Sequence, residues 1–256
     1  MDKDGRGLRL LVAYDGTDFA GWQIQPGKRT VQGELQASLV ALGDPGVLCL
    51  ASGRTDAGVH AHGQVVGVKT RLDLSLFRLK RAIQARLPED IVIRSVAEAP
   101  PDFDPTRQAI AKMYRYTIRH GGEPDVFARK YALHHPAFLD VAAMAKGAGY
   151  LLGTQDFRAF ETRWPNRATS VRTISRASVE GDDGWVTIEV ESSGFLYNMV
   201  RSIVGTLLTV GRGKAPPEEI LRVIQSGQRS EAGATVGPHG LCLMRVTYPP
   251  PLDEWP

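Results

Sequence analysis

Asp56 is the residue of this chain that is best placed to do chemistry, because it stands among small residues just after an apolar run. The run over residues 47–51 predicts a buried strand, which would deliver the carboxylate into a turn containing Gly53 and Gly58. Glycine has no Cβ, so another backbone can approach such a turn closely. Arg54 lies two residues earlier and can hold the carboxylate ionised by charge pairing. An ionised carboxylate depleted of water can serve as a nucleophile or as a base.

An ordinary turn has the same local composition, since an aspartate followed by small residues often accepts backbone N–H bonds. The string around Asp56 is longer than a turn requires. It reads Gly53-Arg54-Thr55-Asp56-Ala57-Gly58-Val59-His60-Ala61, followed by Gly63-Gln64-Val65-Val66. This string resembles the signature of the tRNA pseudouridine synthase A family.

Other segments resemble the same family, in the family's order, from about residue 8 to residue 248. They are Tyr14-Asp15-Gly16-Thr17-Asp18-Phe19-Ala20-Gly21-Trp22-Gln23, Thr30-Val31-Gln32-Gly33-Glu34-Leu35, Lys112-Met113-Tyr114-Arg115-Tyr116, Phe195-Leu196-Tyr197-Asn198-Met199-Val200-Arg201-Ser202-Ile203-Val204-Gly205 and Gly240-Leu241-Cys242-Leu243. The chain departs from the family pattern at residues 103–107, at Cys242 and at residues 234–239. The chain is therefore identified as a member of this family from its motifs, while fine contacts with the substrate are left open.

The resemblance implies a role for each of five residues. Asp56 is the catalytic carboxylate, and Tyr114 stacks on the target base. Arg201 pairs with Asp56 and keeps it ionised. Leu241 forms a wall of the uridine pocket, and Arg54 helps to displace the target base from its stack, as a flat guanidinium can.

Each of the other four residues also has an ordinary structural interpretation. A strand tyrosine such as Tyr114 is commonly part of a core or a sheet surface. Arg201 lies in an otherwise apolar helix, where it is either a surface residue or a paired buried one. Leu241 fits a core, and Arg54 a simple ion pair with Asp56.

The resemblance implies an isomerase that converts uridine to pseudouridine at positions 38, 39 and 40 of the tRNA anticodon stem-loop. It implies tRNA as the partner and a homodimer as the assembly. No cofactor is expected, because the reaction neither hydrolyses nor oxidises, and no metal is expected from the spacing of the histidines and cysteines. Two alternatives are a non-catalytic RNA-binding module and a carboxylate-based nucleosidase. Whether Asp56 attacks C1′ or acts as a base is left open.

The composition is that of an ordinary soluble globular protein, with 43% apolar and 23% charged residues among 256. A formal charge of +3 permits a nucleic-acid partner without requiring one. The two cysteines, Cys49 and Cys242, lie in apolar runs and are expected to be buried thiols. The first residues lack the apolar core of a signal peptide, and no apolar run approaches the roughly 20 residues that span a bilayer. A cytoplasmic protein is expected, without contact to a membrane.

The pattern of elements predicts two similar α+β halves, residues 1–105 and 106–256, divided near Pro100-Pro101. Strands are expected over residues 8–14, 47–51, 63–70, 91–96, 110–118, 171–180, 185–191 and 241–248. Helices are expected over residues 31–42, 74–87, 141–152, 196–210 and 216–226, with Thr30 and Asp140 as N-caps and Gly227 as the end of the last helix. The strands over residues 171–180 and 185–191 are expected to form a hairpin. The fold class is α+β, and the resemblance implies two related ferredoxin-like or RRM-like sub-domains that share an antiparallel-rich sheet with a central cleft. The N-terminal sub-domain would carry Asp56, and the C-terminal one Tyr114, Arg201 and Leu241.

Two basic segments are candidates for contact with RNA phosphates. One is the polar face of the helix expected over residues 74–87, with Arg78, Lys80, Arg81 and Arg86. The other is the segment over residues 158–167. A charged helix face is also the normal surface of a soluble protein.

Overall fold

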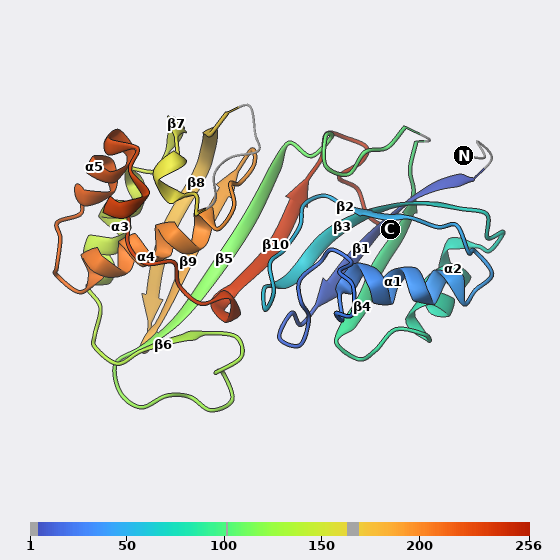
Figure 1. The fold of residues 1–256 in the computed structure, drawn as a ribbon, viewed down its shortest axis with the longest axis horizontal. Coiled ribbons are helices and arrows are strands. Elements are labelled where there is room, and N and C mark those ends of the chain that lie inside the picture. The colour runs from blue at the N-terminus through green and yellow to red at the C-terminus, as the bar shows by residue number, and fades with distance from the viewer. Residues whose placement is uncertain (1–4, 101, 163–168) are drawn as a thin grey trace. The chain divides into compact units, whose positions relative to one another are not determined.

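The computed structural model describes residues 5–100, 102–162 and 169–256 (Figure 1). The chain divides into two compact units. Unit 1 comprises Met1–Ile110 and Leu243–Pro256, and unit 2 comprises Ala111–Cys242. Both units combine helices with mostly antiparallel strands, so the predicted α+β class is confirmed. The sub-domain limits 1–105 and 106–256 stay a prediction.

Unit 1 is built on a long antiparallel pair, β1 against β3, with β4 on the other side of β1. The short β2 pairs with β3 as well, and β10 follows β3 in the hydrogen-bonding order. The strands are β1 (Arg6–Tyr14), β2 (Cys49–Ala51), β3 (His60–Thr70), β4 (Ile91–Glu98) and β10 (Leu241–Thr247), of which Leu241 and Cys242 belong to unit 2. The helices are α1 (Val31–Val40), whose predicted N-cap Thr30 accepts from the Gly33 N–H, and α2 (Leu76–Gln84).

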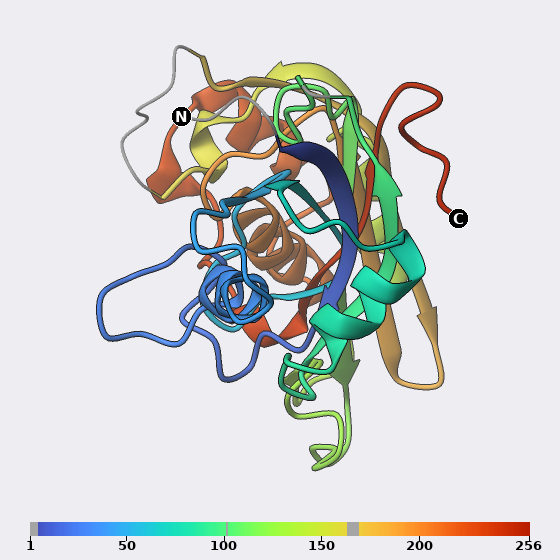
Figure 2. The same cartoon turned by 90° about the vertical axis from the view of Figure 1, so that its right-hand side faces the viewer.

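The two faces of β1 are covered differently. Its alternation buries Leu8, Leu10 and Val12 on one face. Arg9 points to the other side, where its guanidinium donates to the carbonyls of Leu252 and Glu254 and lies 4.6 Å from the Trp255 ring centre. Figure 2 shows α1 and the C-terminal segment on opposite sides of β1. The sheet of unit 1 is thus shielded on both faces near its centre.

The prediction of a buried strand over residues 47–51 is wrong in part. Only Cys49–Ala51 pair with β3, and Leu48 and Leu50 are 51% and 55% exposed. The strand is short and alternates, so one face meets the core while the other meets solvent. Cys49 faces inward, where burial raises the pKa of its thiol to about 12, while Cys242 is half-exposed. The two cysteines are not joined by a disulfide.

Unit 2 has the strand order β5-β9-β8-β7, all antiparallel, with β6 parallel beside β5. The strands are β5 (Ala111–His120), β6 (Leu133–His135), β7 (Gly153–Asp156), β8 (Val171–Asp182) and β9 (Trp185–Ser192). The helices are α3 (Val141–Gly149), α4 (Met199–Gly211) and α5 (Glu219–Ser226), with 3-10 turns η1 (Arg158–Phe160), η2 (Arg229–Glu231) and η3 (Pro238–Gly240). The hairpin β8–β9 is confirmed, whereas β6 and β7 were not expected.

Helix α4 begins three residues later than the predicted start at Leu196. Asn198, with φ 61°, occupies the left-handed region that a helix cannot contain, so Met199 is the first helical residue. The predicted ends of two other elements are confirmed: Asp140 caps α3, and Gly227 closes α5 with a φ of 64°. None of the helices in the described residues combines the length and the apolar character needed to cross a bilayer.

Candidate active site

The turn that carries Asp56 is held in place by backbone contacts from the segment that follows β1. The Trp22 N–H donates to the Thr55 carbonyl at 3.0 Å, and the Gly58 N–H donates to the Phe19 carbonyl at 3.3 Å. The two segments therefore bond to each other on both sides of Asp56. Its side chain is half-buried. This contact is the close approach of a second backbone that small residues permit.

Two glycines of the segment make the approach possible. A Cβ at Gly16 would lie 2.0 Å from the Val59 carbonyl oxygen. A Cβ at Gly21, which has a φ of +94°, would lie 2.8 Å from the Thr55 oxygen and 3.1 Å from the Asp56 carbonyl carbon. Neither position has room for a side chain. The glycines in the motif over residues 14–23 are thus needed for the geometry of the Asp56 turn.

The N-terminal end of helix α1 bonds to the segment that approaches the Asp56 turn. Its first free N–H groups bond outward: Val31 donates to the Gly21 carbonyl and Gln32 to the Trp22 carbonyl at 3.0 Å. The Gln32 side-chain amide also donates to the Cys49 carbonyl of β2 at 2.9 Å. One helix end therefore connects the segment to the strand that precedes the Asp56 turn.

His60 closes the other end of the turn. Its Nδ1 accepts the Gly16 N–H at 3.0 Å and lies 3.1 Å from a carboxylate oxygen of Asp15. The His60 side chain is 8% exposed. In the described part of the chain no three His, Cys, Asp or Glu side chains are grouped so as to hold a metal ion. The signature histidine thus connects the two backbones.

Tyr114 and Tyr116 lie on the buried face of β5 in unit 2. Tyr114 is 8% exposed, and the edge of its ring packs on Phe195 with 5.1 Å between centroids and an interplanar angle of 88°. The Tyr116 hydroxyl donates to the Gly237 carbonyl at 2.8 Å. Burial raises the pKa of Tyr116, and the nearby positive charge of Arg201 opposes that rise.

Arg201 stands in the first turn of α4 and is held by two acceptors. Its Nε donates to the Val236 carbonyl at 2.7 Å, and its Nη1 donates to Asn198 Oδ1 at 2.8 Å. The Asn198 amide donates in turn to Thr162 Oγ1 at 2.7 Å. A freely solvated surface arginine is therefore the wrong interpretation. Asn198 was not singled out in the sequence, although it lies in the matched motif beside Arg201.

Leu241 follows η3 and is 6% exposed. The preceding Gly240 packs against Tyr116 so closely that a Cβ there would lie 2.7 Å from the ring. Within unit 2 the structure thus groups Tyr116, Arg201 and the segment before Leu241. Within unit 1, Asp56 and the exposed Arg54 share one turn.

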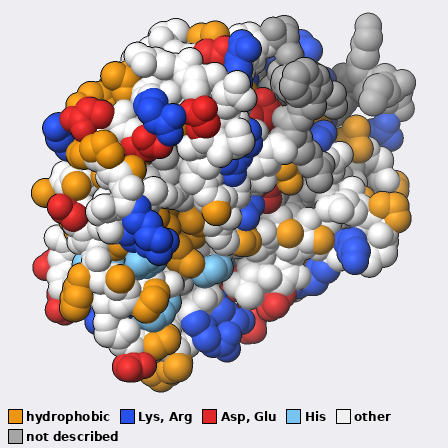
Figure 3. Space-filling model, turned by 60° about the vertical axis from the view of Figure 1, so that its left-hand side comes forward, with side chains coloured by type: hydrophobic (Ala, Val, Ile, Leu, Met, Phe, Trp, Pro, Cys, Tyr) orange, Lys and Arg blue, Asp and Glu red, His pale blue; other side chains and the backbone are white. Residues whose placement is uncertain are grey.

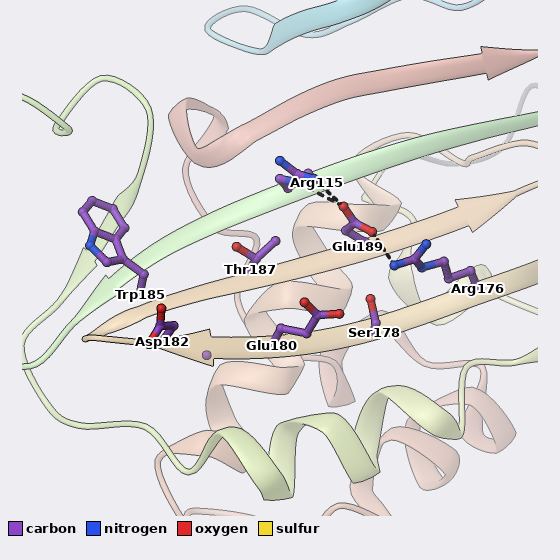
Figure 4. Close-up of a pocket in the computed structure, with 9 residues that line it drawn as sticks. Arg115, Arg176, Ser178, Glu180, Asp182, Trp185, Thr187 and Glu189 are labelled. Carbon is purple, nitrogen blue, oxygen red and sulfur yellow. Dashed lines mark hydrogen bonds and ion pairs between the residues drawn. The ribbon is translucent and has the colours of Figure 1, made fainter.

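A separate hollow of about 500 Å³ lies on the β5-β9-β8 sheet of unit 2 (Figure 4). Three of its charged side chains pair with one another: Glu189 accepts from Arg115 at 2.7 Å and from Arg176 at 2.9 Å. Side chains alternate along a strand, so Arg115 faces away from Tyr114 and Tyr116. The predicted site residues do not line this hollow.

In the two basic segments that were candidates for phosphate contact, some basic side chains are exposed and others are bonded within the protein. Arg78 and Arg81 are exposed on α2, and Arg86 is exposed just beyond its C-terminal end, while Lys80 donates to the Arg94 carbonyl at 2.6 Å. In the second segment Arg158 pairs with Asp156, and residues 163–168 lie outside the described residues. On the face drawn in Figure 3, basic side chains are interspersed with acidic ones. Contact of either segment with phosphates stays a prediction.

Comparison with known proteins places the chain in a class of RNA-modifying enzymes. A family model described as tRNA pseudouridine synthase matches residues 10–106 and 148–249. The matched residues include Asp56, Arg54, Arg201 and Leu241, whereas Tyr114 falls between the two segments. The chain belongs to the tRNA pseudouridine synthase family.

Its relatives within that family carry one name. The chain is 46% identical over 242 residues to tRNA pseudouridine synthase A of Geobacillus kaustophilus (strain HTA426), covering 94% of each chain. It is 46% identical over 246 residues to the protein of that name from Shouchella clausii (strain KSM-K16), covering 96% of this chain and 94% of the relative. It is 45% identical over 255 residues to tRNA pseudouridine synthase A of Chloroflexus aurantiacus (strain ATCC 29366 / DSM 635 / J-10-fl), covering 98% of this chain and 91% of the relative.

Proposed function

We propose that this protein converts uridine to pseudouridine in tRNA, at positions 38, 39 and 40 of the anticodon stem-loop. The observation that carries the proposal is the family match, which extends over both units, together with relatives that are 46% identical over 94% of the chain. The clamped turn of Asp56 adds chemical support, because it presents one carboxylate in a defined orientation.

The reaction is a rearrangement. The N1–C1′ bond of the uridine breaks, the base turns, and C5 bonds to C1′; the C5 proton is released to solvent and N1 takes up a proton. Asp56 supplies the carboxylate, either as a nucleophile at C1′ or as a base on the sugar. In both routes the carboxylate must be charged while water is excluded, which a neighbouring guanidinium favours.

The other site residues follow from the family motif. Tyr114 stacks on the target base, which contributes roughly 1–3 kcal/mol to binding. Its packing against Phe195 fixes the ring for this purpose. Arg201 pairs with Asp56, Leu241 walls the uridine pocket, and Arg54 takes the place of the extruded base.

Release of tritium from tRNA labelled at C5 of uridine tests the reaction directly. The wild-type protein should release tritium, and Asp56→Asn should lower the rate by about three orders of magnitude or more while tRNA binding is largely kept. Asp73→Asn is the matched control, because Asp73 is an exposed carboxylate outside the turn. Near-normal turnover by Asp56→Asn would contradict the assigned role.

The same assay separates the alternative functions. A non-catalytic RNA-binding module would bind tRNA and release no tritium. A nucleosidase would liberate free uracil, which chromatography detects. The resemblance further implies a homodimer in the cytoplasm, and light scattering of the purified protein measures its assembly.

A further inference from the structure

Four buried polar side chains form a hydrogen-bond network beneath the Asp56 turn. Ser52 and Gln64 are fully buried, and Tyr14 and Thr55 are each 5% exposed. Ser52 Oγ donates to Gln64 Oε1 at 2.8 Å, and Gln64 Nε2 donates to the Gly53 carbonyl at 2.8 Å. Gln64 Nε2 also reaches the Tyr14 hydroxyl at 3.4 Å, and that hydroxyl lies 2.7 Å from Thr55 Oγ1. All four residues belong to unit 1.

The orientation of the Gln64 amide in this network is fixed by its partners. The Gly53 carbonyl can only accept, so it fixes the Gln64 amide with nitrogen toward Gly53 and oxygen toward Ser52. The Tyr14 oxygen accepts from the same amide and shares a hydrogen bond with the Thr55 hydroxyl, in which either oxygen can donate. Among the described residues the one buried side-chain polar atom without a partner is Gln108 Oε1, outside the network. Networks that are satisfied in this way rigidify their surroundings.

The network bonds to the residues next to the two functional side chains. Gln64 bonds to Ser52 and Gly53, which precede Arg54, and reaches through Tyr14 to Thr55, which stands between Arg54 and Asp56. Gln64 itself lies on β3, which pairs with β1 at Val12. An apolar side chain would fill the same space without the desolvation cost of an amide. The amide therefore serves orientation rather than packing.

We infer that Gln64 is a positioning residue for the isomerisation. It holds the turn in the geometry that presents Asp56 and Arg54, and Tyr14 connects Gln64 to Thr55 within that turn. The inference rests on the proposed function and deepens it. Neither residue is assigned contact with the substrate. Loss of the network should therefore reduce kcat and leave KM for tRNA nearly unchanged.

Gln64→Glu is the sharpest variant because it preserves shape and replaces the amide donor by an acceptor. A carboxylate oxygen would face the Gly53 carbonyl, so kcat should fall about tenfold to a hundredfold, with KM within about twofold. Burial raises the pKa of a carboxyl group, and its protonated form regains one donor. The ratio of variant to wild-type kcat should therefore rise as pH is lowered. A constant ratio across pH, measured well below both Tm values, would overturn the inference.

Tyr14→Phe removes only the hydroxyl, and Thr70→Val is its matched control. Thr70 lies at the far end of β3, is 1% exposed and bonds to the Asp44 carboxylate. Both variants should lower Tm, since each loses a buried hydrogen bond. Only Tyr14→Phe should lower kcat, by about fivefold to tenfold. Equal kcat values for the two variants would overturn the assignment.

Hydrogen exchange separates failure of this inference from failure of the proposed function. In Gln64→Glu the Trp22 amide, which donates to Thr55, should lose protection, while the Leu10 amide within β1 retains it. If the wild-type protein releases tritium and Gln64→Glu keeps its kcat, only the positioning role is wrong. If the wild-type protein releases no tritium, the proposed function is wrong. In either case, unchanged protection of the Trp22 amide in Gln64→Glu would overturn the positioning role.

Discussion

Gly21→Ala should damage the Asp56 turn without removing any functional group. The new Cβ would lie 2.8 Å from the Thr55 oxygen and 3.1 Å from both the Ala57 nitrogen and the Asp56 carbonyl carbon. All three atoms are backbone, so the turn itself must shift. Gly27→Ala is the matched control, because Gly27 has a positive φ of +67° and nothing within 4 Å of the added Cβ.

The two substitutions are expected to lower the stability of the protein by different amounts. Both introduce a side chain at positive φ, which costs about 1–2 kcal/mol. Gly21→Ala adds overpacking against backbone, about 1–3 kcal/mol more, for a total of about 2–5 kcal/mol. With about 2–4 °C per kcal/mol at this chain length, Tm should fall by about 2–8 °C in Gly27→Ala and by more in Gly21→Ala.

Activity provides the decisive comparison between these variants. Thermal unfolding gives the two Tm values, and tritium release at a temperature well below both gives kcat. A displacement near 1 Å at the carboxylate should cost about a hundredfold in kcat for Gly21→Ala, whereas Gly27→Ala should keep wild-type kcat. Equal kcat values for the two variants would refute the claim that backbone contact with Gly21 places Asp56.

Two further predictions concern unit 2. Asn198→Ala should lower Tm, because alanine at φ 61° is strained, and should lower kcat, because Arg201 loses its acceptor Oδ1. Asn198→Gly removes the strain but not the loss of Oδ1, so it should recover Tm but not kcat. A kcat restored by glycine would contradict the link to Arg201. The hydrogen bond from Arg222 chiefly lowers the pKa of Glu219 below its usual 4.5, so the pair stabilises above about pH 4.5 and loses this effect as pH falls through the lowered pKa. The Tm difference between wild type and Glu219→Gln should therefore be present at pH 7 and shrink toward pH 3; a pH-independent difference would contradict it.

Local signals in the sequence predict element ends well. Thr30 and Asp140 cap α1 and α3, and Gly227 ends α5, because capping chemistry depends on a few adjacent residues. The start of α4 was missed since an asparagine at positive φ has no distinct local pattern. The exposure of Leu48 and Leu50 was missed because β2 pairs over only three residues, which no composition reveals.

For the candidate site, too, local features were predicted from the sequence, whereas features that depend on distant contacts were not. The small residues around Asp56 correctly predicted a close backbone approach. The identity of the approaching segment depends on contacts between residues more than 30 positions apart, such as Trp22 with Thr55. The roles of Gln64 and Tyr14 depend likewise on hydrogen bonds between β1, β3 and the turn. Sequence motifs identified these positions without assigning them a role.

In the proposed function, this chain isomerises uridine in the anticodon arm with the carboxylate of Asp56. Position-resolved mapping of pseudouridine in an unmodified tRNA that has uridines at 38, 39 and 40 tests it most directly. Incubation with the wild-type protein should produce pseudouridine at these positions, and incubation with Asp56→Asn should produce none above background. Pseudouridine formed equally by both proteins, or by neither, would contradict the account.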